Sequence, residues 1–285
     1  MEIKKICVTG AGTMGHGIAQ VCATSGYPVS LFDISDSILE NALGNIRKSL
    51  DRFVEKGKIP GSEKKAILDR IDCSPHLEIA VKDADLVIEA VPEDILLKKQ
   101  VFARMDRLCK EETILASNTS QYSISDIASA TQRPQKVVGM HWFVPPVLMG
   151  LIEIVQGIET SLETIQTIEE IAHRLRKETV VCKDAPGFIT TRALAALTVE
   201  CLRMLEEGVA TAEAIDKAVR LGLNHPMGPF QVADLSGLDT SLHAIEALAD
   251  VYGDRFLPSV TYRNLVRSGR LGRKTGRGFY KYEER

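Results

Sequence analysis

The sequence predicts an α/β protein with a mostly parallel sheet, followed by an all-helical C-terminal part. Three observations on the 285 residues support this fold class: apolar segments alternate with helical segments, a glycine-rich turn follows the first apolar segment, and only helical patterns follow DAPGFI. We therefore expect two domains, over residues 1–185 and 186–285.

The elements of the first domain follow from its apolar pattern. Residues 3–9 predict a buried strand that leads into a helix ending near Ser25, and 27–33 predict a second strand. Helical spacing of apolar residues predicts a helix over 35–57, which Gly57 and Pro60 end. Further strands are expected at 86–91, 113–116, 137–141 and 151–155, and further helices at 94–109 and 124–130. This alternation is typical of a parallel sheet covered by helices on both faces.

The second domain shows only helical patterns. Helices are expected at 187–207, 211–221, 228–235, 238–252 and 259–268. Gly208 ends the first of these helices, and Thr211 is a suitable N-cap for the second.

Composition excludes several classes of function. A net charge of −3 gives no general attraction to nucleic acid or to an anionic membrane. The six cysteines are scattered without metal-ligand spacing, which favours reduced thiols and predicts no metal site. No apolar run approaches the ~20 residues of a membrane span, and the early first strand leaves no place for a signal peptide. We expect a cytoplasmic protein with neither a nucleic-acid nor a membrane partner.

The turn GAGTMG fits the pattern G-x-G-x-x-G of dinucleotide-binding proteins, and its position between a strand and a helix predicts a Rossmann-type sheet. The first glycine permits the tight turn, the second lets a pyrophosphate approach the backbone, and the third lets the helix pack on the strand. The helix N-terminus would then bind the phosphates. The expected cofactor-binding residues of this turn are Gly10, Gly12, Thr13, Met14 and Gly15.

Asp33, at the end of the second strand, indicates which cofactor binds. Its carboxylate would accept hydrogen bonds from the adenosine ribose and repel a 2′-phosphate. No arginine follows at Ile34 or Ser35, so the sequence favours NAD over NADP.

His141 and Glu153 lie in an otherwise apolar stretch, twelve residues apart, on either side of a turn that contains Pro145 and Pro146. If the two flanking strands pair antiparallel, the carboxylate reaches the imidazole. Such a carboxylate fixes the tautomer and raises the basicity of the second nitrogen, which prepares a general base. A purely structural hydrogen bond within the sheet fits the same spacing, and the spacing alone does not decide between the two.

The chain resembles the L-3-hydroxyacyl-CoA dehydrogenase family, and within it the short bacterial 3-hydroxybutyryl-CoA type. The resemblance covers nearly the whole chain and is carried by GAGTMGHGIAQ (10–20), VIEAVPED (87–94), ASNTS (116–120), GMHWF with LIEI (139–154), DAPGF (184–188), NHPMGPFQVADLSGLD (224–239) and GRKTGRGFY (272–280).

The resemblance implies oxidation of an L-3-hydroxyacyl-CoA to the 3-ketoacyl-CoA by NAD, or the reverse reduction. It implies that His141 is the base, that Glu153 orients it and that Ser120 binds the reacting oxygen. It also implies cofactor contacts at Glu93, Lys98 and Asn118 and CoA contacts at Ser49 and Lys56. A homodimer formed through the helical C-terminal domain is usual in this family.

Two positions depart from the family pattern, which has asparagine at both: here they are Val144 and Thr191. The Thr191 hydroxyl supplies one donor near the substrate carbonyl in place of an amide, and Val144 supplies none. Two further functions stay open: a dehydrogenase of a free hydroxy or sugar acid, similar to gulonate dehydrogenase and lambda-crystallin, and a catalytically silent NAD-binding relative. The arm KSLDRFVEKGK argues against a small free acid.

Overall fold

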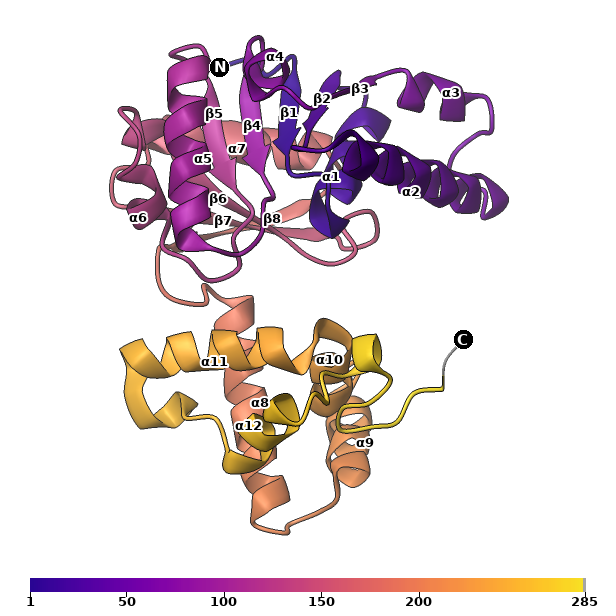
Figure 1. Ribbon diagram of the computed structural model, residues 1–285, viewed down its shortest axis with the longest axis vertical. Helices are drawn as coiled ribbons and strands as arrows, with labels where there is room; N and C mark the ends of the chain where they lie inside the picture. The colour runs from indigo at the N-terminus through magenta and orange to yellow at the C-terminus, as the bar shows by residue number, and fades with distance from the viewer. Residues whose placement is uncertain (284–285) are drawn as a thin grey trace. The chain divides into compact units, whose positions relative to one another are not determined.

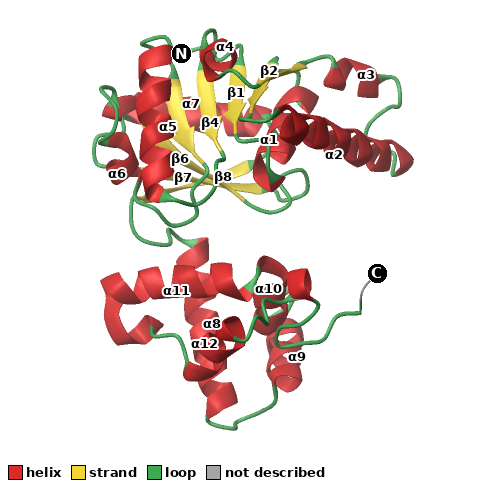
Figure 2. Cartoon of the chain, viewed as in Figure 1, coloured by secondary structure: helices red, strands yellow, loops and turns green. Residues whose placement is uncertain are grey.

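The computed structural model describes residues 1–283, which divide into two compact units, one over Met1–Ala185 and one that begins at Pro186. The predicted fold class is confirmed. The first unit is built on a mostly parallel sheet with helices, and the named elements of the second unit are all helical (Figures 1 and 2).

The sheet of the first unit has eight strands in the order β3-β2-β1-β4-β5-β6-β7-β8. Every neighbouring pair is parallel except β6 and β7. The order reverses between β1 and β4, and ligands of such sheets bind outside the carboxyl ends of the strands at this reversal. The strands are β1 (Ile6–Thr9), β2 (Val29–Phe32), β3 (Ile71–Ser74), β4 (Leu86–Glu89), β5 (Ile114–Ser117), β6 (Val137–Trp142), β7 (Leu151–Gln156) and β8 (Glu178–Lys183).

Helices cover the sheet, so β1, β2, β4, β5 and β6 are buried along their whole length. Of these helices, α1 packs on β1 and β2, α5 on β5, and α7 on β6, β7 and β8. Figure 1 shows α2 extending beyond the sheet, with α3 packed on it. The helices are α1 (Thr13–Thr24), α2 (Asp36–Glu55), α3 (Glu63–Leu68), α4 (Leu77–Val81), α5 (Ile95–Leu108), α6 (Ile124–Ala128), η1 (Pro134–Lys136) and α7 (Leu162–Arg174).

The sequence prediction did not include β3, β8, α3, α4 or α7. Strand β8 lies at the sheet edge and has no fully buried residue, and β3 contains polar residues, so neither has the apolar run of a central strand. Helix α7 does carry a helical signal: Ile165, Ile168 and Ala172 are buried at spacings of three and four, and the Ser161 hydroxyl caps the helix.

The second unit contains the five predicted helices, each within a few residues of its expected bounds. Thr211 is the predicted N-cap, and its hydroxyl accepts a hydrogen bond from the Ala214 N–H at 3.3 Å. Two buried carboxylates hold the unit together: Asp216 accepts hydrogen bonds from the start of α10, and Asp234 accepts them from Phe279 and Tyr280. The elements are α8 (Thr190–Glu206), α9 (Ala212–Gly222), α10 (Pro229–Ser236), α11 (Leu238–Tyr252), η2 (Gly253–Phe256), α12 (Val260–Arg267) and η3 (Arg273–Thr275).

Among residues 1–283, no helix has both the length and the apolar character that crossing a bilayer requires. The same residues contain no group of three or more histidine, cysteine or acidic side chains arranged to hold a metal ion.

Candidate active site

The glycine turn after β1 has the geometry that the sequence predicts. Gly10 has a φ of +95°, and a Cβ there would lie 2.6 Å from the Ala90 carbonyl oxygen. A Cβ at Gly15 would lie 1.6 Å from the Gly10 carbonyl oxygen, so α1 can pack this close only without a side chain. A Cβ at Gly12 would meet nothing within 4 Å. The first and third glycines are therefore required by packing, and the second borders open space.

The start of α1 offers an anion site beside this open space. Gly12 is the N-cap, and no side chain caps the helix, so the N-terminal N–H groups and the helix dipole point toward the turn. Thr13 and Met14 form the first turn of α1. These features fit a pyrophosphate bound at the backbone.

Asp33 lies directly after β2 and is tied to the glycine turn. One carboxylate oxygen accepts a hydrogen bond from the Ala11 N–H, and the other accepts one from the Ile34 N–H, both at 2.8 Å. The side chain stays partly exposed, and each oxygen retains a lone pair for a ribose hydroxyl. The Asp33 carboxylate is thus fixed beside the glycine turn.

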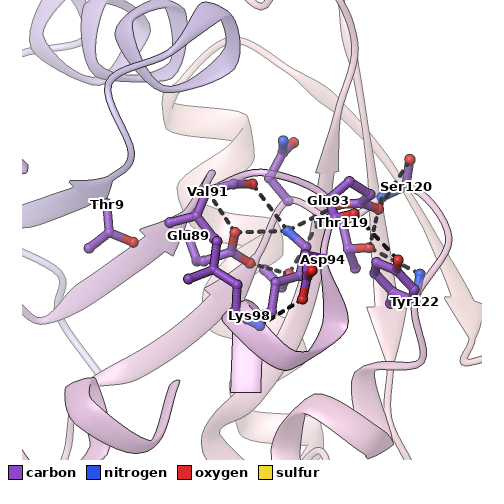
Figure 3. A network of polar contacts seen from close by, with 12 residues as sticks. Thr9, Glu89, Val91, Glu93, Asp94, Lys98, Thr119, Ser120 and Tyr122 are labelled. Atoms are coloured by element: carbon purple, nitrogen blue, oxygen red, sulfur yellow. Dashed lines mark hydrogen bonds and ion pairs between the residues drawn. The ribbon is translucent and has the colours of Figure 1, made fainter. Parts of the chain in front are cut away.

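A buried charge network occupies the carboxyl end of β4 (Figure 3). The Lys98 ammonium donates to Glu89 at 2.8 Å and pairs with Glu93 at 3.0 Å, and the side chains of Lys98 and Glu89 are 1% and 0% exposed. Glu89 also accepts hydrogen bonds from the Ser117 hydroxyl at 2.6 Å and from the Val91 N–H at 2.8 Å. One lysine on α5 therefore holds one carboxylate at the end of β4 and a second in the loop that follows.

Burial and charge act on this network in opposite directions. Burial raises the pKa of the Glu89 carboxyl, although the Lys98 ammonium partly offsets it. Burial alone would lower the pKa of Lys98, but the carboxylates of Glu89 and Glu93 raise it above its ordinary value. Lys98 is therefore held as the cation that the two carboxylates require.

The segment after β5 connects this network to Ser120. Glu93 accepts hydrogen bonds from the Thr119 hydroxyl at 2.6 Å and from the N–H and hydroxyl of Ser120 at 3.0 and 3.4 Å (Figure 3). The Asn118 N–H donates to the Glu89 carbonyl at 2.9 Å, and its side-chain oxygen accepts from the Trp142 N–H at 3.0 Å. The predicted residues Glu93, Lys98, Asn118 and Ser120 thus lie together.

Sequence reasoning missed Glu89, Ser117 and Thr119, which complete this network. A signal was present for the first of these residues, because a glutamate inside the apolar strand LVIEAV must be paired once the strand is buried. The sequence carries no comparable signal for the hydroxyl groups of Ser117 and Thr119.

His141 and Glu153 are brought together as predicted. Strands β6 and β7 pair antiparallel, and His141 stands directly opposite Glu153 in the register. The His141 Nδ1 lies 2.7 Å from a Glu153 carboxylate oxygen, and the side chains are 8% and 0% exposed. The Phe143 ring packs on the imidazole with 4.6 Å between ring centroids. Because a carboxylate can only accept a hydrogen bond, Nδ1 is the donor of this pair.

The remaining predicted residues lie outside these two clusters. Ser49 and Lys56 lie near the C-terminal end of α2, where Lys56 is the C-cap. Thr191 lies in the first turn of α8, in the second unit. Val144 follows Phe143 in the loop after β6 and is 64% exposed.

Comparison with known proteins matches both units. Residues 5–185 match the family model for the 3-hydroxyacyl-CoA dehydrogenase NAD-binding domain, and residues 187–282 match the model for the C-terminal domain of the same enzymes. A probable 3-hydroxybutyryl-CoA dehydrogenase of Bacillus subtilis is 45% identical over 286 residues, which cover 100% of this chain and 99% of the relative. A 3-hydroxybutyryl-CoA dehydrogenase of Clostridioides difficile is 42% identical, over 98% of this chain and 100% of the relative.

Solved structures give the same result. The crystal structure of (S)-3-hydroxybutyryl-CoA dehydrogenase from Ralstonia eutropha superposes with a TM-score of 0.96 at 39% identity, and the match covers 99% of this chain and 100% of that chain. The resemblance seen in the sequence motifs is confirmed.

Proposed function

Because the chain belongs to the 3-hydroxyacyl-CoA dehydrogenase family, we propose that it is an NAD-dependent oxidoreductase that interconverts L-3-hydroxyacyl-CoA and 3-ketoacyl-CoA. The observation that carries the mechanism is the buried pair of His141 and Glu153, held in the same unit as the glycine turn. A short substrate, 3-hydroxybutyryl-CoA, agrees with the names of the relatives.

The residues present fit NAD. The open backbone at Gly12, the uncapped N-terminus of α1 and the fixed carboxylate of Asp33 would hold the pyrophosphate and the adenosine ribose. Glu93, Lys98 and Asn118 would lie toward the nicotinamide half. When bound, NAD accepts the hydride from C3 of the substrate or returns it as NADH.

His141 is the proposed general base. In the oxidation its Nε2 takes the proton of the 3-hydroxyl group as the C3–H bond breaks, and in the reduction the imidazolium returns that proton to the carbonyl oxygen. Glu153 accepts the Nδ1 hydrogen bond throughout, which fixes the ring and stabilises the imidazolium.

Ser120 is the proposed donor to the reacting oxygen. Its N–H and its side chain both contact Glu93, so the charge network around Lys98 determines where the hydroxyl lies. Thr191 would supply a second, weaker donor in place of the asparagine that the resemblance implies at this position.

CoA recognition is assigned to α2. Ser49 and Lys56 would contact the CoA portion, and the length of α2, which extends beyond the sheet, suits an extended ligand (Figure 1). We also infer a homodimer formed through the helical second unit, supported by exposed apolar side chains there such as Leu194, Leu235 and Val260.

Replacing His141 tests the mechanism. In the variant His141→Gln, kcat for acetoacetyl-CoA reduction should fall by about 10²–10⁴-fold, because proton transfer is lost, while the Kd for NADH stays within about twofold. Steady-state kinetics and fluorescence titration of NADH measure the two quantities. His173→Gln, on the exposed face of α7, is the matched control. A His141→Gln variant that retained near wild-type turnover would refute His141 as the base.

A further inference from the structure

Lys177 is a buried lysine that the mechanism above does not use. The residue is 7% exposed and lies just before β8. Its ammonium donates to two main-chain carbonyl oxygens, of Pro146 at 2.7 Å and of Met149 at 2.6 Å. Both acceptors belong to the loop 143–150, which connects β6 to β7 and begins two residues after His141.

Burial of the Lys177 ammonium costs free energy, because the charge loses most of its contact with water. No carboxylate forms an ion pair with it among residues 1–283, and the ammonium lies 5.8 Å from the centre of the Trp142 ring. Burial lowers the pKa of this lysine, and the two carbonyl hydrogen bonds satisfy only part of what water would supply. The two hydrogen bonds fix the loop 143–150, because the Lys177 side chain links two carbonyl oxygens that are three residues apart.

The inner side of the loop 143–150 packs against the first unit. Pro146 is buried, and Val147 packs against the core of the first unit. A Cβ at Gly17 would lie 3.0 Å from the Pro146 ring, so the loop rests on α1, the helix that follows the glycine turn. Lys177 binds the carbonyl of this same proline.

The outer side of the loop is apolar and exposed. Val144, Leu148 and Met149 are 64%, 58% and 40% exposed, a group of apolar side chains close in sequence to the base. If the C3 oxygen of an acyl-CoA contacts His141, the acyl chain begins near His141, because the chain continues from C3. The exposed side chains match the chemistry of a hydrocarbon chain.

We propose that Lys177 is a positioning residue: it fixes the loop 143–150 so that Leu148 and Met149 meet the acyl chain of the substrate. This inference rests on the proposed function and extends it to acyl-chain selection. Lys177 itself touches neither the substrate nor the cofactor.

The test compares Lys177→Met, which keeps the length of the side chain but removes its donors, with Lys177→Arg, which keeps donors. The substrates are acetoacetyl-CoA and 3-ketooctanoyl-CoA, each with NADH. In Lys177→Met, KM for both thioesters should rise by about fivefold or more and their kcat/KM ratio should change by about threefold, since the loop loses its fixed position. The Kd for NADH should stay within about twofold, and Lys177→Arg should restore most of the loss. Lys183→Met, at the exposed end of β8, is the control and should match the wild type.

A second variant does not depend on the folding of Lys177→Met. Leu148→Ala removes an exposed side chain, and it should lower kcat/KM for the eight-carbon thioester about threefold more than for acetoacetyl-CoA, because the longer acyl chain buries more apolar surface against this side chain. An unchanged substrate ratio in both Leu148→Ala and Lys177→Met would overturn the proposal. A Lys177→Met variant whose NADH binding and turnover fall in parallel would also overturn the proposal, because that pattern shows that Lys177 supports the fold of the whole unit and not the position of the loop. Wild-type enzyme that reduces neither thioester would instead refute the proposed function.

Discussion

Lys98 illustrates how one residue holds the candidate site together. Its ammonium is bound between Glu89 and Glu93, and the second of these carboxylates holds Ser120. A buried ion pair contributes little net stability over apolar packing, but removing one partner leaves an uncompensated charge. The network therefore serves to position Glu93 and Ser120. Lys98 is needed to neutralise the buried carboxylate of Glu89 and the neighbouring carboxylate of Glu93.

Loss of Lys98 should be strongly destabilising and pH-dependent. Lys98→Met should lower the free energy of unfolding by about 3–5 kcal/mol at neutral pH, because Glu89 stays buried without a cation. Burial already raises the pKa of Glu89, so in the variant the folded state takes up a proton more readily than the unfolded state. Stability of the variant should therefore recover as pH falls, and chemical denaturation at several pH values measures this.

Lys99→Met is the matched control for this experiment, because Lys99 forms a surface pair with Asp126. We expect this variant to lose less than about 1 kcal/mol at every pH. Equal losses in the two lysine variants would show that the buried network does not carry the stability assigned to it.

At the residue level, the sequence predicted the parts of the site that have a short-range signature. The glycine turn, Asp33 and the pairing of His141 with Glu153 were predictable, because each follows from spacing along one or two strands. Lys177 was not, since its two acceptors lie about thirty residues away and are main-chain carbonyls, which carry no sequence signal.

Asp85 shows how a single carboxylate organises neighbouring elements. One of its oxygens accepts hydrogen bonds from the N–H groups of Lys4 and Lys5 at 2.8 and 3.0 Å, and the Lys110 ammonium lies 3.4 Å from the other. The residue thereby fixes the start of β1 beside the start of β4. Burial alone would raise the pKa of this carboxyl, but these donors lower it below its ordinary value.

Asp85→Asn should lower the free energy of unfolding by about 1–3 kcal/mol at neutral pH, because charge-assisted hydrogen bonds are lost. In the wild type the folded state binds fewer protons at Asp85 than the unfolded state does, so this contribution disappears as pH falls through the lowered pKa. The difference between the two proteins should therefore shrink below about pH 4 in urea unfolding. Asp83→Asn, an exposed neighbour, serves as the control, and a difference that stayed constant with pH would contradict this assignment.

At the level of elements, the central strands were predictable and the edges were not. Strands β1, β2, β4, β5 and β6 are buried on both faces and read as apolar runs. Strand β8 lies at the edge of the sheet and has no fully buried residue, so its position depends on pairing with β7. Tertiary contact determines such a strand more than its own sequence does.

At the scale of the whole molecule, the proposed cofactor site and the proposed proton-transfer pair lie at one edge of the sheet of the first unit. The glycine turn, the charge network and His141 all lie at or near the carboxyl ends of parallel strands β1, β4, β5 and β6, which end at the same edge. Two motifs of the second unit instead have structural roles visible in the contacts: they supply Asp234 and the segment Phe279–Tyr280 that it holds. The family is recognisable from both kinds of motif, but only the first kind indicates the chemistry.

The most direct test of the central claim is NADH oxidation with acetoacetyl-CoA, beside free acetoacetate and 3-ketooctanoyl-CoA. We predict robust turnover of acetoacetyl-CoA and a kcat/KM at least about a hundredfold lower for the free acid, because binding of the CoA portion contributes to the transition state. This result would also show that Thr191 and Val144 support catalysis without the two asparagines. Equal use of free acetoacetate would contradict the assignment in favour of a hydroxy-acid dehydrogenase. NADH binding without turnover of any of the three would contradict it in favour of a silent relative.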